Sequence, residues 1–136
     1  MEVQPDDAIR MLVHRPAVQV HTEDSLRAVA ETLTEESVGV AMVKGTHPPC
    51  LVSERDLVAA LAEGVDPDSS RAADVMTDDV ASATPDETIL DVGVRMLDNE
   101  IRHLPIVEDD VVVGMVSIRD VLAALTRRTR SESRSA

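Results

Sequence analysis

The sequence predicts a mixed chain of the α+β or α/β class, built from two similar β-α-β-β-α units. The first observation behind this prediction is a repeat: the segment from Ser53 to Leu61 recurs 64 residues later, from Ser117 to Leu125. The second is that hydrophobic spacing changes from alternation to helical periodicity in the same order in both copies. Neither copy is comfortably large enough to hold a core alone, so we expect two pseudo-symmetric units packed through their sheets.

The first copy begins with a short alternating run, and Thr22 and Asp24 are candidate N-caps for the helix that follows. Two short apolar runs on either side of a Gly- and Pro-containing turn then predict a hairpin. The predicted elements are a strand at 18–20, a helix through 26–33, strands at 38–43 and 51–52, and a helix from Ser53 that stops before Gly64. In the second copy they are a strand at 80–82, a helix at 87–99, strands at 101–107 and 111–116, and a helix from 118 to about 126.

These elements define the predicted domain organisation: a first repeat at 8–64, a linker at 65–73, a second repeat at 74–126 and a disordered tail at 127–136. The linker is rich in Asp, Ser, Gly and Pro, and 71–76 favours one short helical turn. The tail contains four Arg and three Ser but no large apolar residue, a composition typical of disorder. One extra residue in the second hairpin reconciles the offset of 64 with an offset of 63 upstream.

Composition excludes several classes of function. A net charge of −13 and the absence of Phe, Trp and Tyr argue against nucleic-acid binding, which needs clustered cations or aromatic stacking platforms. No segment is long and apolar enough to span a membrane, and the acidic N-terminus is unlike a secretory signal, so we expect a cytoplasmic protein. A single Cys and four His without ligand spacing predict no metal site. Neither a nucleophile elbow nor a phosphate-binding Gly-rich loop is present, and we predict no enzymatic activity.

Two Ser-x-x-Asp motifs, Ser53 with Asp56 and Ser117 with Asp120, occur where a strand is predicted to pass into a helix. The simplest interpretation is a capping box, in which Ser and Asp satisfy backbone N–H groups at the start of a helix. Their occurrence in register in both copies favours a second interpretation. The positive end of a helix attracts an anion, and a carboxylate can accept hydrogen bonds from a ribose diol.

The segments Arg102-His103-Leu104-Pro105-Ile106-Val107 and Val113-Gly114-Met115-Val116-Ser117-Ile118-Arg119-Asp120 resemble the end of a cystathionine-β-synthase (CBS) domain. Its signature is a Pro-ended strand followed by Gly-x-[Ile/Val]-[Ser/Thr]-x-x-Asp. The segments 74–77 and 84–86 are similar too, and the resemblance covers about residues 8–126. It implies a tandem CBS pair, a module that binds adenine nucleotides or adenosyl ligands in clefts between its repeats and commonly dimerises.

The resemblance also implies roles for individual residues. It makes Asp120 the ribose acceptor with Ser117 as its helper, and places Arg102 and His103 beside the phosphates. Asp56 and Ser53 take the equivalent roles in the first repeat. Arg119 and Arg55 follow the Ser and could reach phosphate oxygens, with His14 and Arg15 adding positive charge. Without an aromatic ring, the base must lie between aliphatic side chains and backbone, for which the candidates are Val18, Gly39, Val40, Met42, Val80 and Pro105.

The first repeat departs from the family pattern, with Cys50 in place of the expected Gly and Met42 in place of the Pro. We therefore predict a stand-alone regulatory module and ligand sensor that binds an adenosine-containing ligand of the AMP, ADP or ATP class. S-adenosylmethionine and NAD(H) remain open as ligands, and no cofactor is required. The module is expected to form a homodimer and to signal occupancy to an effector protein in trans. The alternative hypothesis is a ligand-free CBS-fold protein that only dimerises or docks.

Overall fold

The computed structural model describes residues 3–13, 17–78 and 80–135, with the backbone alone described from residue 127 onward. Contacts along the chain divide it into two compact units. The central unit consists of residues 17–80, and the split unit combines residues 1–16 with residues 81–136. Within the described ranges, no helix is both long and apolar enough to cross a membrane.

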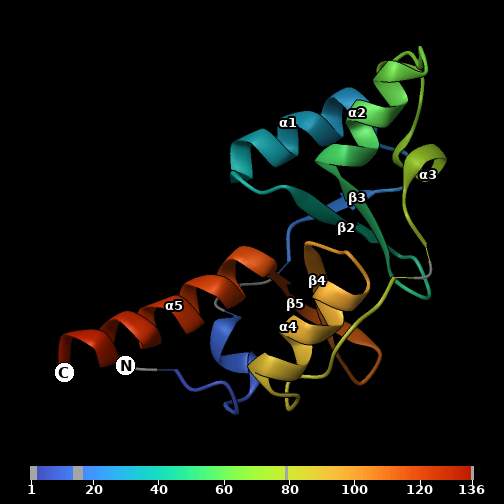
Figure 1. Cartoon of the computed structure of the whole chain (residues 1–136). Coiled ribbons are helices and arrows are strands. Elements are labelled where there is room, and N and C mark those ends of the chain that lie inside the picture. Colours follow the sequence, from blue (N-terminus) through green and yellow to red (C-terminus); the bar gives the residue numbers. More distant parts are fainter. Residues whose placement is uncertain (1–2, 14–16, 79, 136) are drawn as a thin grey trace. The chain divides into compact units, whose positions relative to one another are not determined.

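The central unit contains a three-stranded sheet in the order β1-β2-β3, with helices α1 and α2 over one face (Figure 1). Its elements are β1 (Gln19–His21), α1 (Leu26–Glu36), β2 (Val40–Lys44), β3 (Cys50–Ser53), α2 (Glu54–Ala62) and α3 (Ala72–Val75). Strand β1 pairs parallel with β2, and β2 pairs antiparallel with β3. Buried side chains from β1, β2, β3, α1 and α2 form one core. The predicted order of elements is confirmed here.

Helix α1 begins at a different residue from the one predicted. Its N-cap is Ser25, whose hydroxyl oxygen accepts a hydrogen bond from the Ala28 N–H at 3.1 Å. Asp24, one of the two predicted caps, instead accepts from the N–H of His21 at 2.9 Å and closes the turn before the helix. The reason is local, because the chain must first turn after β1 before its N–H groups can follow a helix axis.

The split unit contains a two-stranded antiparallel sheet, β4-β5, packed with helices from both ends of the chain. Its elements are the 3-10 helix η1 (Ile9–Leu12), α4 (Ile89–Asp98), β4 (His103–Glu108), β5 (Val111–Ser117) and α5 (Ile118–Ser135). Asp109 and Asp110 both have positive φ, as a tight two-residue hairpin turn requires. The ladder changes register after Ile106, and this bulge accommodates the extra residue expected in the second hairpin.

Each repeat contributes its leading segment to the other repeat's unit. The Ile9 N–H donates to the Glu87 carbonyl at 2.7 Å, and 63 residues later the Ala72 N–H donates to the Asp24 carbonyl at 2.8 Å. The same spacing relates two isolated bridges, Ala8 with Thr88 and Ser25 with Arg71. Residues 8–16 thus belong to the unit that contains 81–126, and residues 65–80 to the unit that contains 17–64. The packing units therefore begin and end at other residues than the repeats predicted at 8–64 and 74–126.

The strand predicted at 80–82 does not form. In the central unit the Met42 N–H donates to the Val18 carbonyl at 2.8 Å, which extends the pairing in front of β1. The residue equivalent to Met42 is Pro105, which has no N–H to donate. Only a single parallel bridge, Ala83 with Ile106, remains of the expected strand. A proline in the middle of a strand has removed one hydrogen bond of the ladder and with it the neighbouring strand.

Helix α5 runs to Ser135, through most of the segment predicted to be a disordered tail. This prediction was based on the absence of large apolar residues after 126, but the segment contains no Gly or Pro to stop a helix. Arg and Glu are good helix formers, and Ser is only moderately unfavourable. The helix that starts in the core at Ile118 therefore continues along the chain.

Glu87 and Arg95 form an ion pair that links the start of α4 to the segment before it. The Arg95 guanidinium also donates to the Ser82 carbonyl at 2.8 Å, and Glu87 accepts from the Thr84 N–H at 2.8 Å. The hydrogen bond from Arg95 lowers the pKa of Glu87 below its ordinary value of 4.5, and burial opposes it more weakly. A carboxyl with a depressed pKa in the folded state stabilises the fold above its unfolded pKa.

Acid should therefore remove this stabilisation. Between neutral pH and pH about 3, wild-type protein is expected to lose up to about 1 kcal/mol more stability than Glu87→Gln, because both side chains are about one-third exposed. Urea unfolding followed by circular dichroism at several pH values measures the difference. Glu36→Gln, at the exposed end of α1, is the control and should keep the wild-type slope. An equal slope for Glu87→Gln would show that the ion pair adds nothing.

Candidate functional site

The candidate site in the split unit is the junction between β5 and α5. The Ser117 hydroxyl accepts from the Asp120 N–H at 3.0 Å, and Asp120 Oδ2 accepts from the Ser117 N–H at 3.0 Å. The two residues thus form the capping box that their spacing predicts. Asp120 is exposed, and within the described part of the chain its Oδ1 accepts no hydrogen bond. This arrangement fixes the carboxyl group and leaves one oxygen facing solvent.

The equivalent junction between β3 and α2 in the central unit has the same box with an additional donor. Asp56 Oδ2 accepts from the Ser53 N–H at 2.8 Å, and the Ser53 hydroxyl accepts from the Asp56 N–H at 3.2 Å. The Thr77 hydroxyl lies 3.2 Å from Asp56 Oδ1 and 3.3 Å from Oδ2. Thr77 reaches this position because it bridges Leu51 on the edge of β3. The Asp56 carboxylate is therefore bound within the protein at both oxygens.

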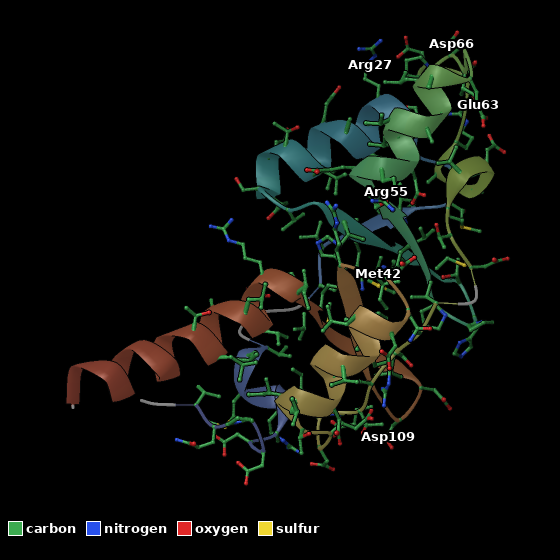
Figure 2. The ribbon with its side chains drawn as sticks, in the orientation of Figure 1. Arg27, Met42, Arg55, Glu63, Asp66 and Asp109 are labelled. Carbon is green, nitrogen blue, oxygen red and sulfur yellow. The ribbon has the colours of Figure 1, made fainter. Side chains whose placement is uncertain are left out.

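The cations predicted near the phosphates are available at these junctions. Arg102 and Arg119 in the split unit and Arg55 in the central unit are exposed, and none forms an ion pair with a described residue. Figure 2 shows Arg55 at the beginning of α2. The Arg102 carbonyl accepts from the Ile118 N–H at 2.8 Å, which fixes this residue beside the start of α5. The central unit has Gly39 in the equivalent place, so its junction lacks one cation.

His103 is half-buried and pairs with Ser117 across the β4-β5 ladder, so it lies at the same end of the sheet as the capping box. The structure thus brings together four predicted residues of the second repeat: Ser117, Asp120, Arg102 and His103. The first repeat's Ser53 and Asp56 are likewise joined to the β2 end at Gly39 and Val40, because the Glu54 N–H donates to the Gly39 carbonyl at 2.9 Å and Val40 pairs with Ser53.

The residues predicted to surround a base are apolar and largely removed from solvent. Val40 and Met42 on β2 and Pro105 on β4 are buried, whereas Val18 and Val80 are half-buried and lie outside the strands. Met42 is labelled in Figure 2. Val80 belongs to the central unit, although the sequence assigned it to the second repeat. His14 and Arg15, predicted to add positive charge near the first site, lie outside the described residues.

Two features of the site were missed by sequence reasoning. The first is Thr77, whose hydroxyl contacts Asp56 from 21 residues away. The second is the Ala81 carbonyl, which accepts no hydrogen bond from the described chain because Pro105 replaces the expected donor. The proline gave a usable indication, since its missing N–H follows from the alignment of the two copies. No group of three or more His, Cys, Asp or Glu able to hold a metal ion occurs in the ranges that the structure describes.

Comparison with known proteins gives the same family at the level of sequence and of fold. The CBS domain family matches residues 72–127. The mitochondrial CBS domain-containing protein CBSX3 of Arabidopsis thaliana is 32% identical over 118 residues, which cover 82% of this chain and 57% of that protein. The chain spans about half the length of the curated relatives it matches.

Two solved structures extend the likeness to nearly the whole chain. A CBS domain protein from Pyrobaculum aerophilum, complexed with AMP, is 27% identical with a TM-score of 0.78, over 90% of this chain and 98% of that one. The CBS domain pair of protein MJ0100, in complex with 5′-methylthioadenosine and S-adenosyl-L-methionine, has a TM-score of 0.82 at 22% identity, over 91% of this chain and 99% of that one. The second likeness shows the fold alone. With its two β-α-β-β-α repeats and mixed α+β fold, the chain belongs to the CBS domain family as a CBS domain pair.

Proposed function

We propose that this CBS pair is a non-catalytic ligand sensor that binds an adenosine-containing ligand of the AMP, ADP or ATP class, in the cytoplasm. The proposal extends to S-adenosylmethionine and NAD(H) as competing ligands. Ligand occupancy regulates an effector protein in trans, because the chain would adopt two packings that bind the ligand with different affinity. The relative from Pyrobaculum aerophilum, whose structure was solved with AMP, supports this choice of ligand class.

The observation that carries the proposal is the exposed carboxylate of Asp120. It is held in place by the Ser117 N–H and has one oxygen free of partners in the described chain. A carboxylate in this position can accept from a ribose hydroxyl, and the exposed Arg102 and Arg119 can pair with phosphate oxygens. These two cations lie at one helix start, where the positive end of α5 also favours an anion.

The proposed module acts as a homodimer. Helix α4 carries three exposed apolar side chains at helical spacing, Leu90, Val94 and Leu97, and the helices α2 and α5 add Val58, Leu61 and Leu122. A self-complementary apolar patch of this kind suits a two-fold interface. The same patch is also the observation that favours the alternative function, a ligand-free interaction protein. Ligand titration separates the two functions, because only the sensor binds an adenosyl ligand.

Asp120→Asn is expected to weaken AMP binding roughly 10- to 100-fold, since a hydrogen bond to a charged group is lost while the cap persists. Asn keeps an oxygen that can accept from the Ser117 N–H, so the fold should survive. Isothermal titration calorimetry measures the affinity, because the chain has no aromatic residue for intrinsic fluorescence. The ligand panel is AMP, ADP, ATP, S-adenosylmethionine and NADH, each at low and high salt.

The matched control is Asp98→Asn, which removes the same charge from an exposed position at the end of α4. It should bind like the wild type, so a general electrostatic effect of one acid fewer is accounted for. Unchanged affinity in Asp120→Asn would reduce Asp120 to a helix cap. Silence of folded wild-type protein across the whole panel would overturn the sensor and favour the interaction protein.

A further inference from the structure

The two Ser-x-x-Asp junctions occupy equivalent places in the fold, but their polar groups differ in availability. In the central unit, Asp56 is held by the Ser53 N–H at 2.8 Å and by the Thr77 hydroxyl at 3.2 and 3.3 Å from its two oxygens. In the split unit, Asp120 accepts only from the Ser117 N–H at 3.0 Å among the described residues. A ligand hydroxyl must displace Thr77 at the first junction, whereas it displaces only water at the second.

The backbone next to each junction differs in the same direction. The Val18 carbonyl is occupied by the Met42 N–H at 2.8 Å. Its equivalent, the carbonyl of Ala81, accepts no hydrogen bond from the described chain because Pro105 carries no N–H. A half-buried carbonyl without a partner costs free energy that an external donor, such as an amino group, can recover.

The open groups of the split unit lie at one end of its sheet. Ala83 bridges Ile106 in parallel, so Ala81 lies toward the end where β4 begins. His103 at that end pairs with Ser117, from which α5 and Asp120 follow. Strands are about 4.8 Å apart, so the Ala81 carbonyl and Asp120 are separated by on the order of 10 Å across β4. A nucleoside can span this distance from its base to its ribose.

Charge separates the two junctions for a third time. Arg102 stands beside the start of α5, where the central unit has Gly39 beside the start of α2. Each unit also has one Arg directly before its Asp, Arg119 and Arg55, so the split unit has one cation more. In a chain of net charge −13, an extra local cation weighs heavily for a phosphate-bearing ligand.

From these three differences we infer that the chain binds a single adenosine phosphate, at the Asp120 junction of the split unit, while the Asp56 junction is a structural cap closed by Thr77. The inference rests on the proposed function. It assigns Thr77 and Pro105 opposite effects on ligand access: Thr77 closes one junction, and Pro105 opens the other.

Calorimetric titration with AMP tests the assignment. We expect a single AMP per chain, an affinity in Asp56→Asn within about threefold of wild type, and a loss of tenfold or more in Asp120→Asn. Thr77→Val should also bind like the wild type, because Thr77 serves only Asp56. Two equal sites per chain, or an equal loss in Asp56→Asn and Asp120→Asn, would overturn the inference and leave the proposed function standing.

Amide NMR spectra of the wild-type chain give a second test that needs no substitution. Addition of AMP should shift the amides of Arg102 and of residues 117–120, and leave those of residues 53–56 in place. Shifts centred on residues 53–56 would overturn the assignment although AMP binds. Absence of any response to AMP, in calorimetry and in spectra, would instead remove the proposed function and this inference with it.

Discussion

Ile9→Ala is expected to lower the free energy of unfolding by about 2–5 kcal/mol, one of the two largest effects that the structure predicts. The Ile9 side chain is 0% exposed and lies in the core of the split unit, among residues from 83 to 121. Removing its methylene groups leaves a cavity that the surrounding strands and helices can only partly fill. Urea unfolding followed by circular dichroism gives the change in free energy.

The control for this prediction is Arg10→Ala at the neighbouring position. Arg10 is exposed and forms an ion pair with Asp86 at the surface, which contributes at most about 1 kcal/mol. The contrast between adjacent residues separates burial from any general effect on η1. If Ile9→Ala costs no more than Arg10→Ala, the N-terminal segment is not part of this core in solution.

Gly114→Ala is the second substitution with a large expected effect, a loss of about 1–3 kcal/mol. A Cβ added at Gly114 would lie 2.2 Å from the Cγ1 atom of Val13, far closer than two carbon atoms can approach. Either β5 or the segment that carries Val13 must then move. The change in stability is again measured by urea unfolding.

A double-mutant cycle identifies the cause of this loss. Val13→Ala removes the clashing atom, and the remaining Val13 Cβ is 3.5 Å from the new Cβ, an ordinary contact. The double variant should therefore be more stable than the sum of the single effects predicts. Strict additivity would show that Gly114 is needed for its backbone and not for the space that Val13 occupies.

Much of the fold could be predicted from the sequence because local patterns determine it. Helical spacing, turn residues and the 64-residue repeat located every helix of the two repeats and both hairpins. The exchange of leading segments could not be predicted, because a short apolar turn such as Ile9–Leu12 fits either core equally well. The choice depends on long-range hydrogen bonds such as that from Ile9 to Glu87, which leave no periodic pattern in the sequence.

The candidate site was predictable in its residues but not in its occupancy. The spacing of Ser117 and Asp120 predicted the capping box, and the structure contains it. Whether a carboxylate oxygen remains open depends on what approaches it from elsewhere, as Thr77 approaches Asp56. The ligand-binding roles of these residues stay predictions. Proline at position 105 was the one residue whose chemistry alone forecast a local change, a lost donor beside Ala81.

The reciprocal placement of the leading segments has a consequence for how such a chain could have arisen. Residues 71–78 complete the unit of residues 17–64, and residues 8–13 complete the unit of residues 81–126, through the same set of hydrogen bonds. Two copies of a half-length chain could make those contacts by trading segments with each other. Gene duplication and fusion would then turn a swapped dimer into one polypeptide without breaking a hydrogen bond, and the join would lie in the loop after Gly64.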